Sequence, residues 1–335
     1  MDTSDVSVVI PAHNSAGTLG LCLEALAKST VQPLECVVVD DCSSDDVRTV
    51  AQRHGARLIV LSKRVGPAGA RNAGVRHARG GLILFLDADV CVHPDTIARV
   101  VKHFRDDRSL DAVIGAYDDS PAAASALSQY RNLLHSFTHR VGRREASTFW
   151  AGCGAIRKVA FLGCGGLDES YDRPSIEDIE FGVRLKAAGG RILLDHEIQV
   201  THLKCWTFAS MLKTDIFDRG VPWTRLLLRA GSMPDDLNVR WGQRLSVLFA
   251  FLLVAALGSG SAIAALACAL ACGLLNLRFY MFLAARRGPL FLCYAVPLDF
   301  LFHLYSGVSF VLGTGAHFFS VMKASFVAVT REETS

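Results

Sequence analysis

Two long stretches of almost uncharged residues, 245–277 and 290–321, constrain the fold of this chain more than any other feature. At about 1.5 Å rise per residue, either stretch would be roughly 50 Å long as one straight helix, whereas the hydrocarbon core of a bilayer is about 30 Å thick. Each stretch is too long for one upright span and short for two. A buried helix pair in a large soluble protein is the alternative, but runs of this length and purity favour membrane helices.

Glycines interrupt both apolar stretches. The segment 258–261 predicts a turn inside the first, and Gly307, Gly313 and Gly315 are expected to loosen the second. We therefore predict a membrane domain of about three to four hydrophobic helices over residues 241–325, followed by a polar tail at 326–335.

The segment between the two stretches carries Arg278, Arg286 and Arg287. Positive residues next to apolar spans favour the cytoplasmic side, so we expect a cytoplasmic loop here. Asp299, His303 and His317 lie within the second stretch and would be costly in contact with lipid, so we expect them to face protein or an interface.

The first 240 residues alternate short β-branched runs with helix-like segments. We expect strands at 6–10, 36–39, 57–61 and 82–86, and helices at 19–27, 46–54 and 68–78. This alternation is typical of βαβ units and a parallel sheet, whose ligands bind at the carboxyl ends of the strands. The prediction is an α/β domain over residues 1–240 with a mostly parallel sheet and flanking helices.

Composition excludes several classes of protein. A net charge of only +3 over 335 residues, without interleaved aromatic and basic residues, argues against nucleic acid as a partner. The ten cysteines contain no C-x-x-C pair and are interpreted as buried thiols in a reducing compartment. The N-terminal MDTSDVSVVIP has no basic region or cleavage site, so we expect the first domain to stay in the cytoplasm.

Asp87 and Asp89 follow the predicted strand at 82–86. Two carboxylates separated by one residue at a strand end can both reach one divalent cation and, through it, a diphosphate. Hard oxygen ligands suit Mg²⁺ or Mn²⁺. Such a pair alone is weak evidence because it recurs in loops, but its position after a buried strand favours a metal site.

Asp40 and Asp41 end the preceding predicted strand, where a carboxylate can accept hydrogen bonds from a base or a ribose. The alternative is a turn whose Ser and Asp residues cap the next helix, and both can hold for different residues. Arg71 lies in GPAGARNAG, a glycine-rich helix start that would place a guanidinium near phosphate or sugar. No P-loop ending or G-x-G-x-x-G motif is present, which argues against kinases and dehydrogenases.

Glu177 and Asp178 precede an amphipathic segment that ends at Gly189 and Gly190. The spacing of Ser175 and Asp178 resembles a capping box, so stabilisation of the helix start explains the acids simply. A carboxylate fixed there is also well placed to act as a general base.

Over residues 6–223 the sequence resembles family 2 glycosyltransferases with a GT-A fold. The resemblance rests on the order of six motifs: VVIPAHN, VVVDDCSSD, GPAGARNAG, LFLDADV, WAGCGAIRKVAFLGCGGLDE and EDIEFGVRLKAAGG. It implies a Rossmann-like sheet, here followed by transmembrane helices. It also implies an inverting enzyme that moves a sugar from a nucleoside diphosphate donor to an acceptor.

The resemblance implies a role for each matching residue. Asp178 would be the base, and Asp87 and Asp89 would hold metal and diphosphate, with His202 of VTHLKCW as a further metal or phosphate contact; an isolated His is more often structural. The nucleotide side would comprise Pro11, Asn14, Asp40, Asp41, Arg71 and Asp87. The acceptor side would comprise Glu177, Trp150, Gly152, Arg219 and Trp223.

One departure bears on the type of product. Processive synthases of this family carry a Q-x-x-R-W block, whereas here DIFDRGVPW has Arg219 and Trp223 without the Gln. This argues against processive polymerisation. The two residues could line the acceptor site, although an interfacial tryptophan is the plainer interpretation.

These inferences predict a metal-dependent hexosyltransferase, using Mg²⁺ or Mn²⁺, that binds a nucleoside diphosphate sugar, with a UDP-sugar favoured. The acceptor would be membrane-associated and lipid-linked. The enzyme would be a multi-pass protein of the inner (plasma) membrane with its catalytic domain in the cytoplasm. Two alternatives stay open: a polyprenyl-phosphate sugar synthase, and a non-catalytic membrane assembly protein that binds nucleotide sugars without turnover.

Overall fold

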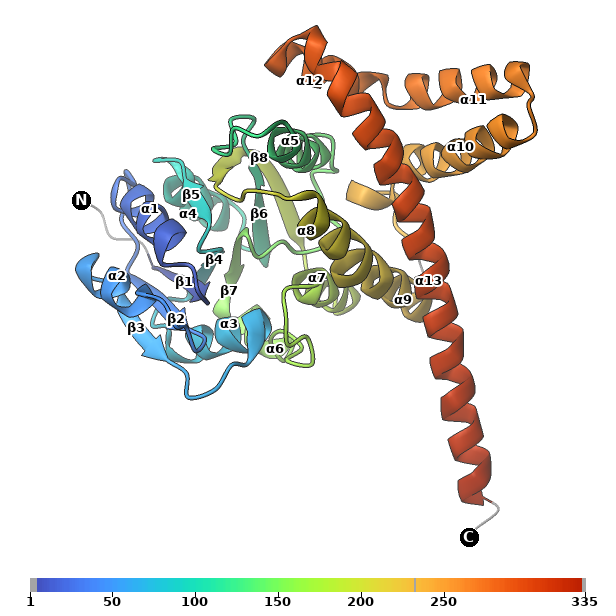
Figure 1. Ribbon diagram of the computed structural model, residues 1–335. Coiled ribbons are helices and arrows are strands. Elements are labelled where there is room, and N and C mark those ends of the chain that lie inside the picture. Colours follow the sequence, from blue (N-terminus) through green and yellow to red (C-terminus); the bar gives the residue numbers. More distant parts are fainter. Residues whose placement is uncertain (1–4, 232, 333–335) are drawn as a thin grey trace. The chain divides into compact units, whose positions relative to one another are not determined.

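The computed structural model describes residues 5–231 and 233–332, without the side chains of 238 and 324–332. The chain forms two compact units that divide between Trp206 and Thr207 (Figure 1). The boundary at residue 240, predicted from the sequence between the α/β domain and the membrane domain, concerns function and stays a prediction. Of the predicted polar tail, residues 326–332 continue the last helix and residues 333–335 lie outside the described part of the chain.

Eight strands of the described residues form one sheet in the order β3-β2-β1-β4-β7-β6-β8-β5. β1 pairs in parallel with β2 and β4, β2 with β3, and β6 with β8. β7 is antiparallel to β4 and β6, and β5 is antiparallel to β8. The bounds are β1 Val6–Ala12, β2 Glu35–Asp40, β3 Arg57–Val60, β4 Leu82–Leu86, β5 Val90–Val92, β6 Ala112–Tyr117, β7 Cys153–Arg157 and β8 Ile192–His202.

Helices connect the strands and flank the sheet (Figure 1). The predicted α/β fold is thereby confirmed, as a mixed sheet. In the first unit the helices are α1 Ala16–Ala27, α2 Val47–Arg53, α3 Gly66–His77, α4 Thr96–Asp106, α5 Ala126–Arg140, α6 Lys158–Gly163 and α7 Glu177–Ala187.

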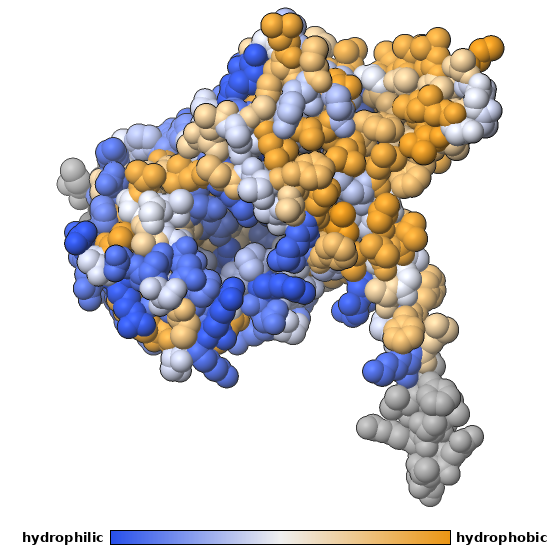
Figure 2. All heavy atoms as spheres, viewed as in Figure 1, coloured by the Kyte–Doolittle hydropathy of each residue, from blue (hydrophilic) through white to orange (hydrophobic). Residues whose placement is uncertain are grey.

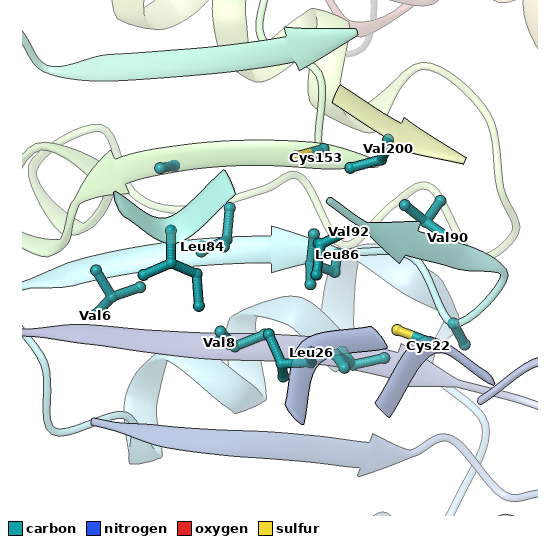
Figure 3. Close-up of a cluster of buried hydrophobic side chains, with 14 of the residues drawn as sticks. Val6, Val8, Cys22, Leu26, Leu84, Leu86, Val90, Val92, Cys153 and Val200 are labelled. Carbon is teal, nitrogen blue, oxygen red and sulfur yellow. The ribbon is translucent and has the colours of Figure 1, made fainter. Parts of the chain in front are cut away.

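The buried core of the first unit follows from the sequence pattern. Strand β1 is apolar at nearly every position because helices cover both faces of its sheet. Helix α4 instead buries one stripe, Thr96, Ile97, Val100 and Phe104, at the spacing of an amphipathic helix. Figure 3 shows part of the resulting cluster, in which side chains of β1, α1, β4, β5, β7 and β8 meet.

The cysteines are free thiols. Cys22 and Cys153 belong to this cluster, as Figure 3 shows. Burial raises the pKa of Cys153, as does the charge of Asp87, to about 12, so this thiol stays protonated at neutral pH.

The second unit is helical throughout its described secondary structure. Its helices are α8 Phe208–Lys213, the π-helix η1 Thr214–Gly220, α9 Val221–Ala230, the 3₁₀ turn η2 Leu237–Val239, α10 Trp241–Gly258, α11 Ala262–Leu275, α12 Leu277–Arg287, the 3₁₀ turn η3 Pro289–Phe291, and α13 Leu292–Glu332. Figure 2 shows apolar residues gathered over the helices of this unit. Leu266, Leu274 and Val311 are among the exposed apolar side chains of this unit.

Among the described residues, α10 and the helix over 289–323 are long and apolar enough to cross a membrane. Helices α11 and α12 pass the same test together but are bent by 64° at the break between them, so they form either a broken span or a re-entrant segment. The predicted turn at 258–261 is confirmed, because α10 ends at Gly258 and α11 begins at Ala262.

Two expectations for this unit were wrong. The arginine-bearing segment is helix α12 rather than a loop, since its Leu, Ala, Met and Arg residues are good helix formers and Arg286 and Arg287 suit the last turn. Helix α13 continues through Gly307, Gly313 and Gly315. A side chain at Gly307 would overlap Phe251, so this glycine permits close helix packing instead of breaking the helix.

Asp299 and His303, two polar residues of α13, are buried in protein, as expected. Both are 1% exposed, and the Tyr280 hydroxyl donates to Asp299 Oδ2 at 2.9 Å. The Asn276 amide donates to the Ser246 hydroxyl at 3.0 Å. His317, by contrast, is only half-buried.

Candidate active site

Most of the residues singled out in the sequence gather at one edge of the sheet. Asp40 is the last residue of β2 and pairs in register with Ala12 at the end of β1. Asp87 directly follows β4, and its backbone N–H donates to the Gly152 carbonyl just before β7, at 3.3 Å. His202 ends β8 and pairs in register with Val90, which brings Asp89 beside it. This is the carboxyl edge at which parallel sheets bind ligands.

Arg71 of α3 joins two acidic segments at this edge. Its guanidinium donates to Asp87 Oδ1 at 2.6 Å and to Glu177 Oε1 at 2.8 Å. The Arg71 side chain is 6% exposed, as is that of Glu177, whereas that of Asp87 is 34% exposed. Burial lowers the pKa of Arg71, but the charges of Asp87, Glu177 and Asp178 outweigh this effect and raise it. Arg71 therefore stays charged and neutralises part of the acidic edge.

The approach of α3 to this edge depends on Gly66. Gly66 has φ +78°, a value that favours glycine, and a Cβ there would collide with the Asp172 backbone. Asp41 accepts the N–H groups of Val65 at 2.7 Å and Gly66 at 2.9 Å, which secures the helix start. Asp41 therefore plays the capping role that the sequence left open, although for α3 rather than α2.

Asp178 lies in the first turn of α7. Its Oδ1 accepts from the Ile179 N–H at 2.8 Å, and its Oδ2 accepts from the Ala151 N–H at 3.0 Å. These bonds fix the carboxylate against the segment that contains Trp150 and Gly152. Ile176 is the N-cap residue of α7 and makes no side-chain capping hydrogen bond, and the Ser175 N–H donates to Glu177 Oε2 at 2.9 Å.

Asp89 and His202 face each other, with 3.5 Å between Asp89 Oδ2 and His202 Nε2. The imidazole is buried and stacks on Tyr117, with ring centroids 4.3 Å apart and planes 18° apart. Its Nδ1 lies 2.8 Å from Asn132 Oδ1 on α5. Burial raises the pKa of Asp89, but His202 and Lys204 outweigh it, so the net pKa is lowered.

These side chains fit a divalent cation held partly by substrate. Within the described ranges, no three His, Cys, Asp or Glu side chains are grouped closely enough to hold a metal ion by themselves. Mg²⁺ usually takes only one or two carboxylates and completes its shell with water and substrate phosphates. Asp89, which is 30% exposed, and the neighbouring His202 together supply such a partial set of ligands. Asp87 is committed to Arg71 through Oδ1.

The proposed nucleotide side is held by a loop after β2. Asp40 is fully buried: its Oδ1 accepts from the Ser43 N–H at 2.8 Å and its Oδ2 from Arg48 Nε at 2.7 Å. Burial raises the pKa of Asp40, but these bonds outweigh it and lower the pKa. Asn14, with φ +50°, accepts from the Ser44 N–H at 2.8 Å and so ties this loop to the end of β1.

The proposed acceptor-side residues divide between the two units. Trp150 packs edge-on against Tyr117, with ring centroids 4.7 Å apart, and lies against Gly152, where a Cβ would overlap the indole. Glu177, which is expected on this side, is buried against Arg71, since a charge so enclosed needs a cation, and its role stays a prediction. Arg219 in η1 and Trp223 in α9 belong to the second unit, so their roles stay predictions.

Two residues beside His202 were missed by the sequence analysis. Asn132 and Tyr117 are buried around the imidazole. Ser128, Asn132 and His139 are buried polar residues on one face of α5. Polar residues at this helical spacing were a signal that could have identified the buried face of α5 that contacts His202.

Comparison with known proteins gives a family match for part of the chain. Residues 7–163 match the model of the family described as Glycosyl transferase family 2. The succinoglycan biosynthesis protein ExoO of Rhizobium meliloti (strain 1021) is 41% identical over 101 residues, which are 29% of this chain and 29% of that protein. The undecaprenyl-phosphate 4-deoxy-4-formamido-L-arabinose transferase of Edwardsiella ictaluri (strain 93-146) is 39% identical over 106 residues, 29% of this chain and 33% of that protein.

The matched part thus spans about a third or less of either relative. Among solved structures, the mannosyltransferase PcManGT from Pyrobaculum calidifontis, in complex with GDP-Man and Mn²⁺, has a TM-score of 0.59 and 18% identity. The match covers 92% of this chain and 87% of PcManGT. At this identity the likeness shows a common fold.

Proposed function

Residues 7–163 match the model of glycosyl transferase family 2, and from that premise we propose that the chain transfers a sugar from a nucleoside diphosphate donor to a membrane-associated, lipid-linked acceptor. A UDP-sugar is the first donor to test. The observation that carries the proposal is the convergence of Asp87, Asp89, Asp178 and Arg71 at the carboxyl edge of the sheet.

The proposed reaction is a single displacement with inversion. Asp178 takes the proton from the acceptor hydroxyl while the oxygen of that hydroxyl forms a bond to the anomeric carbon. The bond from that carbon to the diphosphate oxygen breaks, and the nucleoside diphosphate leaves with the electron pair. The Ala151 and Ile179 N–H groups hold the carboxylate in one orientation, which is the condition for efficient general base catalysis.

A bound Mg²⁺ or Mn²⁺ would neutralise charge on the leaving diphosphate. Asp89 and His202 are the residues that would hold it, and Asp87, which is paired with Arg71, is the third ligand proposed from the sequence. Mn²⁺ is the first ion to test, because it was bound in PcManGT. Chelation should abolish turnover and added Mn²⁺ should restore it, whereas full activity in excess chelator would remove the metal from the proposal.

Asp178→Asn tests the proposed base. An amide keeps the size of the side chain but cannot accept a proton at neutral pH, so turnover should fall by about 10²-fold to 10⁴-fold while donor affinity is retained. Glu180→Gln is the matched control: it removes a carboxylate from the same helix, but one that pairs with Arg184 at 2.6 Å. Normal turnover in Asp178→Asn would exclude it as the base, and lost donor binding would assign it to the nucleotide site.

A polyprenyl-phosphate sugar synthase is the second candidate. The relative from Edwardsiella ictaluri supports it, since its name specifies transfer involving undecaprenyl-phosphate. Supplying membranes with a labelled donor and polyprenyl phosphate separates the two candidates. A lipid-phosphate sugar that accumulates as the final product favours this candidate, whereas a product extended on an existing lipid-linked glycan favours the first.

A non-catalytic assembly protein is the alternative from another class. Such a protein would bind the donor without releasing diphosphate. A panel of nucleotide sugars with membranes from expressing cells, assayed for both binding and diphosphate release, decides between the classes.

We also propose that the protein is a multi-pass protein of the inner (plasma) membrane with the first unit in the cytoplasm. The apolar surfaces of α10, α11 and α13 support membrane insertion. Arg278, Arg286 and Arg287 of α12 support a cytoplasmic position for that helix. Single cysteines introduced near these arginines in a cysteine-free variant should resist impermeant reagents in intact cells; labelling from outside would reverse this topology.

A further inference from the structure

Asn132 of α5 occupies a position that determines which nitrogen of His202 carries a proton. Asn132 is 1% exposed. The Trp206 indole N–H donates to its Oδ1 at 3.1 Å, and its Nδ2 donates to the Lys204 carbonyl at 3.2 Å. An indole N–H can only donate and a carbonyl can only accept, so these two partners fix the orientation of the amide.

The fixed amide in turn fixes the tautomer of the histidine. His202 Nδ1 lies 2.8 Å from the same Asn132 Oδ1, which can only accept. Nδ1 must therefore carry a hydrogen and donate it. In a neutral imidazole the lone pair then lies on Nε2.

That lone pair faces another acceptor. Asp89 Oδ2 lies 3.5 Å from His202 Nε2, and Asp89 is 30% exposed, so the pair opens toward solvent at the sheet edge. Two electron-rich atoms at this distance favour a cation between them. Tyr117, stacked on the imidazole at 4.3 Å, limits rotation of the ring.

We propose that Asn132 is a positioning residue that holds the Nε2 lone pair of His202 toward Asp89, so that imidazole and carboxylate together bind the divalent cation that accompanies the nucleoside diphosphate. The inference rests on the proposed function. Asn132 acts through His202 and does not itself touch the cation. Partners of this kind, one shell beyond the ligands, typically change metal affinity by about 10-fold to 100-fold.

Mn²⁺ binding to the full-length protein, with UDP present, provides a test that does not depend on turnover. Bound Mn²⁺ is measured by electron paramagnetic resonance, and electron spin-echo modulation detects a coordinated imidazole nitrogen. The wild type should show nitrogen coupling. Asn132→Leu should lose the coupling and bind Mn²⁺ about 10-fold to 100-fold more weakly.

Two variants separate positioning from packing. Asn132→Asp keeps an oxygen that accepts from His202 Nδ1, so it should retain nitrogen coupling. Trp206→Phe removes the other donor to the same oxygen and disturbs the same packing. It should leave both affinity and coupling unchanged, because Asn132 Nδ2 still donates to the Lys204 carbonyl and this bond alone keeps the amide oriented. Loss of coupling in Trp206→Phe equal to that in Asn132→Leu would overturn the proposal in favour of a packing role.

The outcomes also distinguish this inference from the proposed function. Unchanged affinity and coupling in Asn132→Leu overturns the inference alone. Mn²⁺ binding without nitrogen coupling in the wild type overturns it together with the role of His202 as a ligand, but leaves the proposed sugar transfer standing. Absence of Mn²⁺ binding in the wild type overturns it together with the proposed metal site. If Asn132→Leu does not fold, ¹⁵N-histidine spectra of the wild type decide: a His202 Nδ1 without hydrogen overturns the proposal.

Discussion

The Arg71–Glu177 pair allows a quantitative test of what holds the sheet edge together. We consider the single substitutions Arg71→Met and Glu177→Leu and their combination. Both side chains are 6% exposed and 2.8 Å apart. Each single substitution leaves its former partner buried with less compensation, whereas the double substitution leaves an apolar pair of similar volume.

The expected magnitudes follow from this burial. Removing one partner of a buried ion pair costs about 3–5 kcal/mol, and we take the lower end because Arg71 keeps Asp87 and Glu177 keeps the Ser175 N–H. For a domain of this size about 3 kcal/mol corresponds to a fall in melting temperature of roughly 6 to 12 °C. The double variant should lose less than the sum of the two single variants, with a coupling energy of about 2 kcal/mol or more.

Tryptophan fluorescence during thermal unfolding in detergent measures these shifts. Trp150 and Trp206 report on the first unit once Trp223 and Trp241 of the second unit are replaced by Phe. Strictly additive shifts in the double variant, or a shift below about 2 °C in Glu177→Leu, would refute the account of Arg71 as a buried charge that depends on Glu177.

Two further predictions concern the stability of the first unit. Burial raises the pKa of Glu35, but hydrogen bonds from Arg79, Ser7 and Arg57 outweigh burial, so the net pKa is lowered. The ionised Glu35 carboxylate therefore stabilises the fold fully above about pH 4.3, the ordinary pKa of Glu, and this stabilisation is lost as the pH falls through the folded-state pKa. The melting-temperature difference between wild type and Glu35→Gln should be constant from about pH 6 to 8 and shrink below about pH 4. Gly182→Ala should lower the melting temperature by several degrees, because a Cβ there overlaps the Phe149 backbone, whereas Gly163→Ala, with nothing within 4 Å, should be neutral or slightly stabilising.

Local patterns predicted the alternating half of the sheet correctly. Strands β1 to β4 and helices α1 to α3 were predicted because each is a short apolar run or an amphipathic segment bounded by turn residues. The antiparallel strand β7 and the long-range pairing of β5 with β8 are not local, and they depend on which strands meet in three dimensions. The proximity of Asp89 and His202 follows from that pairing, so the sequence could predict it only through the family resemblance.

The helices of the second unit show a different limit. Gly307 and Gly313 were expected to loosen the second apolar stretch because glycine has a low helix propensity, but α13 continues through both. In an apolar environment an unpaired backbone N–H or C=O is so costly that the helix persists, and the glycine then serves packing. The packing partners, Phe251 for Gly307 and Thr224 for Gly313, are distant in sequence and leave no periodic signal.

The charge balance of the edge connects the fold to the proposed chemistry. Asp87, Asp89, Glu177 and Asp178 bring four carboxylates to one region, opposed by Arg71 within it and by Lys204 near Asp89. A diphosphate adds roughly two more negative charges, and like charges in a partly buried site repel strongly. Arg71 is already held by two carboxylates, so it cannot turn to the diphosphate without leaving Glu177 buried and unpaired. A divalent cation at Asp89 and His202 would supply the missing positive charge where the donor phosphates enter, which is why the orientation of one buried imidazole matters to the proposed activity.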